Sequence, residues 1–74
     1  LPDTEPAQRA LSAFLARGVA GCGLHDLAET LRRLDPRQRE LLAAALPYPP
    51  AMTPARGRCD QLRALFEGLA KENA

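Results

Sequence analysis

The stretch LDPRQRELLAAALPYPPAMTP, residues 34–54, decides the fold because it holds a complete set of helix start and stop signals. Asp35-Pro36-Arg37-Gln38 predicts an N-cap, a proline at the first helical position and a capping box. Pro47-Tyr48-Pro49-Pro50 prevents the helix from continuing, since proline has no N–H to donate. Thr53-Pro54 then repeats the start signal. We therefore expect a helix over 36–46, an extended segment, and a second helix from Pro54.

Two further helices are predicted upstream, because apolar residues recur there at spacings of three and four. The first covers 4–19, with Asp3 or Thr4 as its cap, and glycines at 18, 21 and 23 end it. The second covers 24–34, where Glu29 is placed to pair with Arg33. Their expected buried residues are Ala7, Ala10, Leu11, Phe14, Leu15 and Val19, then Leu24, Leu27, Ala28, Leu31 and Leu34.

The same spacing predicts the buried faces of the two later helices. In the helix over 36–46 the expected face is Leu41, Leu42, Ala45 and Leu46. In the last helix, over 54–71, it is Cys59, Leu62, Leu65, Phe66 and Leu69. Gly57 weakens the first turn of this helix, so its start could move to Arg58.

Composition agrees with an all-α fold, a small bundle of four short helices. The chain has one valine and neither isoleucine nor tryptophan, whereas strands favour β-branched and aromatic residues. Its 74 residues form one domain, and a chain of this size buries only about 60% of its unfolded surface. The core must therefore come from leucine and alanine, with Phe14 and Phe66 as its aromatic members.

The chain begins Leu-Pro-Asp without an initiator Met, and residues 1–74 are interpreted as one helical interaction domain excised from a longer protein. No run of about 18 apolar residues indicates a membrane span. The two cysteines, Cys22 and Cys59, are too few for a disulfide framework. We expect both to be free thiols and the setting to be intracellular, cytoplasmic or nuclear.

Candidate catalytic and metal-binding residues are few. Cys22-x-x-His25 is half of a zinc motif, and Cys59 and Asp60 are distant in sequence. Cys22 or Ser12 with His25 is the only thinkable nucleophile–base pair, and no third group orients it. We therefore expect no catalysis, no cofactor and no metal.

Charge is distributed unevenly along the chain. The net charge is +1, with +4 over residues 32–63 and −3 over the remainder. The stretch from Leu27 to Leu42, LAETLRRLDPRQRELL, resembles the entry to a sigma-factor-type helix-turn-helix domain, which implies nucleic-acid binding. After Leu46, however, prolines replace the turn and recognition helix that such domains require. Nucleic-acid binding through the arginines at 32–39 and 56–63 is therefore the alternative function.

The preferred hypothesis is a non-catalytic protein–protein interaction or scaffolding module that binds a partner helix or peptide in an interhelical groove. Arginines at the rim would steer an acidic partner. Tyr48 either anchors the partner or packs over the end of the bundle. A homodimer remains open, and no membrane partner is expected. The predicted partner-binding residues are Arg33, Arg37, Tyr48, Arg56 and Arg58.

Overall fold

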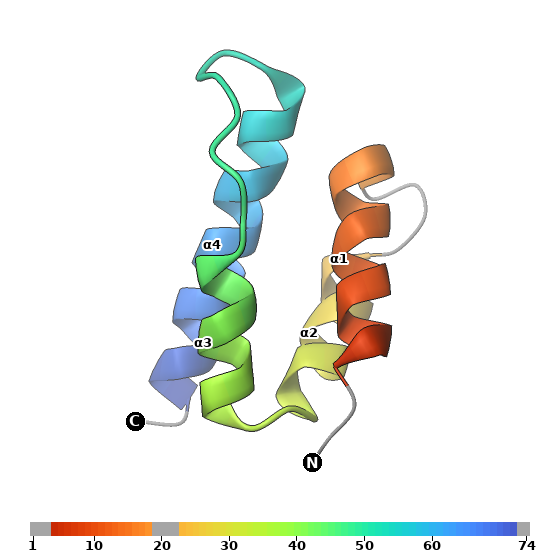
Figure 1. The fold of residues 1–74 in the computed structure, drawn as a ribbon, viewed down its shortest axis with the longest axis vertical. Coiled ribbons are helices and arrows are strands. Elements are labelled where there is room, and N and C mark those ends of the chain that lie inside the picture. Colours follow the sequence, from red (N-terminus) through yellow and green to blue (C-terminus); the bar gives the residue numbers. More distant parts are fainter. Residues whose placement is uncertain (1–3, 19–22, 73–74) are drawn as a thin grey trace.

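The fold is all-α, as predicted, and forms a small compact bundle (Figure 1). A computed structural model describes residues 4–18 and 23–72 of the chain. Within these residues the helices are α1 (Glu5–Arg17), α2 (Leu24–Arg32), α3 (Pro36–Ala44) and α4 (Pro54–Glu72). The molecule measures 35 × 23 × 19 Å along its principal axes.

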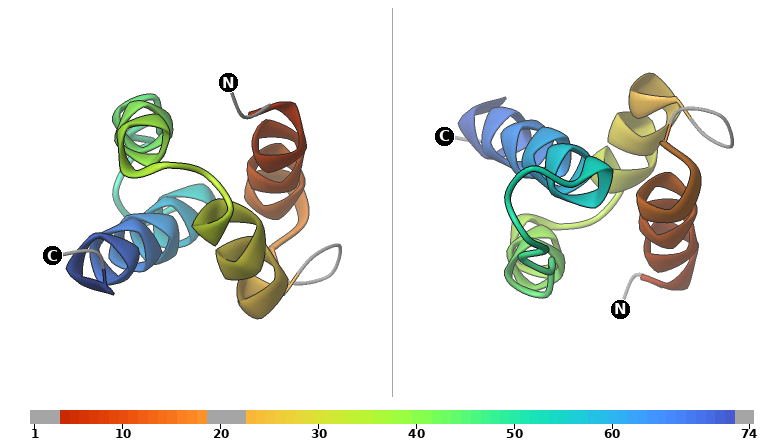
Figure 2. Two further views of the ribbon diagram at one scale, coloured as in Figure 1. Left: turned by 90° about the horizontal axis from the view of Figure 1, so that it is seen from below. Right: turned by 90° about the horizontal axis from the view of Figure 1, so that it is seen from above.

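The helices form two antiparallel hairpins, α1–α2 and α3–α4, arranged as two layers. Figure 2 shows α1 and α3 in one layer, and α2 and α4 in the other. The long helix α4 packs against each of the other helices, whereas α1 packs mainly on α2 and α4. With 19 residues, α4 is roughly 28 Å long at 1.5 Å per residue. It is therefore the element around which the shorter helices gather.

The core is a leucine and phenylalanine cluster to which every helix or its end contributes. Phe14, Leu27, Leu31 and Leu62 are completely buried. Around them lie Ala7, Leu11, Leu34, Leu46, Phe66 and Leu69. The predicted buried face of α4 is confirmed, with Leu65 only partly buried. Cys59 is also buried and is a free thiol, while Cys22 lies outside the described residues.

The start signals of α3 and α4 are confirmed. Asp35 Oδ1 accepts a hydrogen bond from the Gln38 backbone N–H at 3.1 Å, and the Gln38 side chain accepts one from the Asp35 N–H. These bonds form the capping box, with Pro36 in the first turn. Thr53 Oγ1 accepts from the Arg56 N–H at 3.3 Å. Gly57 does not move the start of α4, because this cap already fixes the turn from Pro54.

The ends of α1 and α2 differ from the prediction by a few residues. Thr4 occupies the N-cap position of α1, but its side chain makes no capping hydrogen bond. At the other end Gly18, with φ 67°, closes the helix after Arg17, as a glycine in the left-handed region can. The predicted cap Asp3 and the predicted last residue Val19 lie outside the described residues. Helix α2 ends at Arg32 because the following N–H groups tighten to three-residue spacing.

The predicted buried face of α3 is partly wrong. Leu46 is buried and Leu42 half-buried, but Leu41 is 65% exposed and Ala45 is exposed. The inward face instead continues from Leu46 and Leu42 to Arg39, which is buried at 7% exposure. The prediction considered apolar residues alone and therefore missed Arg39, a cation that occupies the inward position one turn before Leu42.

The assignment of Leu46 to the buried face and of Leu41 to the exposed side leads to a stability prediction. Leu46→Ala should lower the free energy of unfolding by about 2–5 kcal/mol, because it leaves a cavity in the core. Leu41→Ala, the same change on the exposed side, should alter it by no more than about 0.5 kcal/mol. Urea denaturation followed by circular dichroism measures both. Equal losses for the two variants would mean that α3 faces the core differently.

Candidate functional site

The Arg39 side chain is buried and does not contribute to a basic surface. Its Nη1 donates to the carbonyl oxygens of Leu34 at 2.8 Å and Leu31 at 3.1 Å. Leu31 lies in the last turn of α2, where carbonyls run short of N–H partners, and its carbonyl also accepts from the Leu34 N–H. Leu34 follows the end of the helix, and Arg39 is the donor to its carbonyl. A cation there also interacts favourably with the helix dipole. Arg39, part of the 32–39 cluster, therefore caps a helix.

Arg58 does the same for α1. Its Nη1 donates to the Leu15 carbonyl in the last turn of α1 at 2.9 Å, across 43 positions of sequence. The side chain passes close to Gly18, where a Cβ would lie 3.4 Å from Arg58 Nε. The positive φ of Gly18 is the feature that favours glycine at this position, because a Cβ there would still be in ordinary contact with Arg58. Arg58, predicted to bind a partner, is half-buried and ties α4 to α1.

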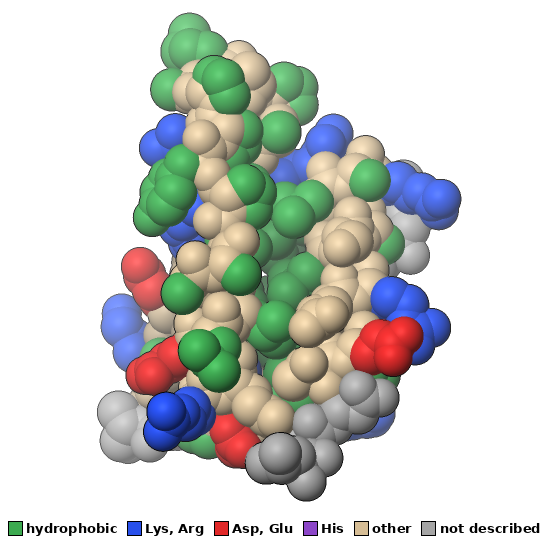
Figure 3. Space-filling model, in the orientation of Figure 1, with side chains coloured by type: hydrophobic (Ala, Val, Ile, Leu, Met, Phe, Trp, Pro, Cys, Tyr) green, Lys and Arg blue, Asp and Glu red, His purple; other side chains and the backbone are tan. Residues whose placement is uncertain are grey.

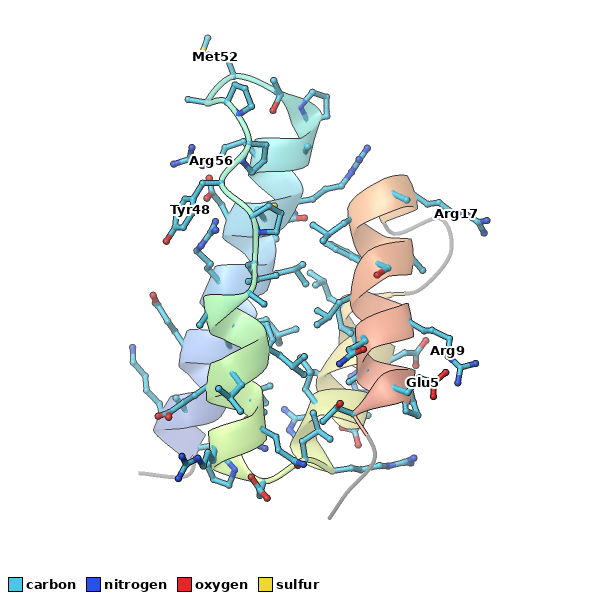
Figure 4. The ribbon with its side chains drawn as sticks, viewed as in Figure 1. Glu5, Arg9, Arg17, Tyr48, Met52 and Arg56 are labelled. Atoms are coloured by element: carbon cyan, nitrogen blue, oxygen red, sulfur yellow. The ribbon has the colours of Figure 1, made fainter. Side chains whose placement is uncertain are left out.

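Tyr48, Arg56 and Arg63 come together beside the extended chain that follows α3, here called the proline segment (residues 46–52). Arg63 Nη2 donates to the Pro47 carbonyl at 2.6 Å, and its Cζ lies 3.8 Å from the centroid of the Tyr48 ring. Arg56 Nη1 donates to the Pro49 carbonyl at 3.1 Å, with its Cζ 5.8 Å from the same ring. Figure 4 shows Tyr48 and Arg56 side by side on the flank of the segment.

Asp60 balances part of this positive charge. Its Oδ1 lies 3.3 Å from Arg56 Nε and 3.5 Å from Arg63 Nη1. The Arg63 Nη1 atom is buried and makes no hydrogen bond with any described residue, so its contact with the carboxylate is electrostatic only. The face of the Tyr48 ring offers the guanidinium a further favourable interaction. The cluster therefore keeps an excess of one positive charge.

Of the two interpretations of Tyr48, the one in which it packs over the end of the bundle is wrong. Its side chain is 76% exposed, and Met52 at the tip of the segment is fully exposed. Met52 also has a φ of 81°, a left-handed conformation that is unusual for a residue other than glycine. In Figure 3, hydrophobic side chains gather over this end of the α3–α4 hairpin. Exposed apolar side chains of this kind often mark a contact surface.

Arg33 and Arg37 are exposed and lie apart from this cluster. Neither side chain forms a hydrogen bond or ion pair with another described residue. The expected Glu29–Arg33 pair does not form, because Glu29 binds Arg32 instead at 2.6 Å. Arg32 also lies 3.4 Å from Glu72 at the end of α4. The turn between α2 and α3, which the 32–39 arginines flank, lies at the end of the molecule opposite the start of α4, so these arginines do not converge with those at 56–63 (Figure 1).

A groove of about 340 Å³ runs between α3 and α4. Its lining residues are Pro36, Arg39, Glu40, Ala43, Phe66, Glu67 and Ala70. Most of this surface is apolar, and the exposed charged residues beside it are Glu40 and Glu67. The rim is therefore acidic, whereas sequence reasoning placed arginines there. The spacing of apolar residues predicted that Phe66 is buried, but it did not indicate that Phe66 lines a groove.

The positions of the other residues considered for catalysis or metal binding give little support to either role. Ser12 and His25 are exposed, on α1 and α2. The described residues hold no group of three or more His, Cys, Asp or Glu side chains placed to bind a metal ion, and Cys22 lies outside them. Among residues 4–18 and 23–72, every helix is too short or too polar to cross a bilayer.

No protein-family model matches the chain, and comparisons with curated proteins and with solved structures give no match. The function is therefore inferred from the geometry of the groove and of the proline segment.

The role of Arg39 makes a second stability prediction. Arg39→Met keeps much of the side-chain volume but leaves the Leu31 and Leu34 carbonyls without their charged donor. We expect the free energy of unfolding to fall by about 1.5–3 kcal/mol. Arg37→Met, an exposed arginine two positions away, should change it by about 0.5 kcal/mol or less. Chemical denaturation of both variants measures this, and an Arg39→Met protein as stable as the control would show that the cap contributes nothing.

Proposed function

We propose that this chain is a non-catalytic protein interaction domain that holds an amphipathic helix or peptide of a partner in the α3–α4 groove. The observation that carries the proposal is the groove itself. It brings the almost fully buried Phe66 together with Ala43 and Ala70, on two helices that are fixed to each other. Small residues on facing helices let a third segment approach closely, and the mostly apolar lining of the groove gives that segment a surface to cover.

The size of the groove favours side chains over a whole small molecule. Ligand pockets hold about 300–1,000 Å³ and enclose most of the ligand, so a groove of 340 Å³ lies at the lower limit. Such a volume suits one or two apolar side chains of a bound segment. An amphipathic helix presents side chains at this kind of spacing, one turn apart.

The charges beside the groove define the partner further. Glu40 and Glu67 are exposed on opposite sides of it, one from α3 and one from α4. A segment with apolar residues on one face and a lysine or arginine at its edge complements this arrangement. We further propose an intracellular setting, for which the reduced, buried Cys59 is the supporting observation.

A matched pair of alanines on α4 tests the groove. Peptides that bind the domain would be selected from a displayed library of amphipathic helices, and their affinities measured by fluorescence anisotropy. Ala70→Gln adds bulk inside the groove and should weaken the selected peptides about tenfold or more. Ala64→Gln makes the same change at an exposed position outside the groove lining and should leave affinity unchanged.

Two outcomes would count against the groove. One is a selection that yields no binding peptide, and the other is peptides equally tolerant of both substitutions. A labelled DNA duplex in the same assay tests the alternative function. Tight binding that falls steeply with salt would favour nucleic-acid recognition instead.

A further inference from the structure

We infer that the proline segment is a preformed polyproline ligand, presented to a partner domain whose groove is lined by aromatic side chains and edged by acidic residues. This surface is separate from the α3–α4 groove, and the inference does not depend on the function proposed above. Its basis is the burial pattern along the segment, the contacts that hold its backbone, and the charge beside it.

Burial differs from residue to residue over the first five positions of the segment, 46–50, which lie outside any helix or turn. Leu46 is buried and, three positions later, Pro49 is half-buried, while Pro47, Tyr48 and Pro50 are exposed; the chain then turns at Ala51 and Met52, which are both exposed. A polyproline II helix has three residues per turn, so one of its three edges contacts the body and two face outward. One outward edge carries Pro47 and Pro50, and the other carries Tyr48. Proline at every third position is the spacing that polyproline-binding domains recognise.

The backbone of the segment is held in place from α4. Arg63 and Arg56 donate to the carbonyls of Pro47 and Pro49, and Thr53 Oγ1 donates to the Pro50 carbonyl at 2.7 Å. The Tyr48 carbonyl makes no hydrogen bond with another described residue and is free to accept one from a partner. Because the extended conformation is already fixed, binding loses less conformational entropy than it would with a flexible peptide.

Charge complementarity defines the edge of the partner. Arg56 and Arg63 lie against the segment with side chains 34% and 22% exposed, and Asp60 neutralises only one of them. An acidic residue beside an aromatic groove would therefore meet a net positive charge. Aromatic side chains of the partner would stack on the exposed proline rings, next to Tyr48.

The test uses the whole chain and a panel of purified SH3, WW and EVH1 domains that carry a tryptophan in the groove. The chain itself has no tryptophan, so intrinsic tryptophan fluorescence reports on the panel domain alone. We expect at least one domain to bind with a micromolar Kd, more weakly at high salt. Pro47→Ala with Pro50→Ala should weaken that binding about tenfold. Pro6→Ala, an exposed proline on α1, is the matched control and should have no effect.

A second variant keeps the test independent of backbone changes. Ala51→Glu adds bulk and a negative charge directly beside the exposed Pro50 while retaining every proline, and it should also abolish or weaken binding. Amide shift changes should map to residues 47–51 when the domain is added. Failure of every panel domain to bind, full binding by the Pro47/Pro50 variant, or shifts centred on Phe66 and Ala70 would each overturn the inference, the last by assigning binding to the α3–α4 groove.

Discussion

Backbone carbonyls without an N–H partner are the constraint on which this structure depends. The described residues form four helices, and the C-terminal end of each helix leaves carbonyls that the helix itself cannot satisfy. Arginines from later in the chain meet this need at three junctions. Arg39 caps the end of α2, Arg58 the end of α1, and Arg56 with Arg63 hold the chain after α3. Arginine suits the task because its guanidinium offers five donors in a fixed plane.

This use of arginine changes the meaning of the charge pattern. The +4 over residues 32–63 suggests a basic surface, yet much of that charge is directed at carbonyls or paired with Asp60 and Glu72. The remaining exposed arginines of this stretch, Arg33 and Arg37, lie together beside the turn between α2 and α3. A charge count along the sequence cannot distinguish an arginine that faces solvent from one that caps a helix, because the sequence does not show what each side chain contacts.

Local signals predicted the helices well, whereas tertiary contacts decided the site. Asp35, Gln38 and Thr53 act on N–H groups within three residues of them, so their capping roles can be read from the chain. Arg58 acts on Leu15, and no local pattern connects residues so far apart. Arg39 is likewise buried because of a tertiary contact, with the carbonyls of Leu31 and Leu34, and this contact is the reason that the expected buried face of α3 was partly wrong. The groove could not be predicted, because it depends on how α3 and α4 are aligned, and the spacing of residues along one helix carries no information on that alignment.

The prolines at 47, 49 and 50 explain why both candidate surfaces lie on the α3–α4 hairpin. They stop α3 without a tight turn, so several extended residues must follow before Thr53 starts α4. Extended chain leaves its carbonyls unpaired, and α4 supplies Arg56 and Arg63 to two of them. The same contacts bind the segment to α4, while Arg39 joins the start of α3 to the end of α2. Because the segment is tied to α4 in this way, α3 lies beside α4, and the two helices form the groove lined by Ala43 and Phe66.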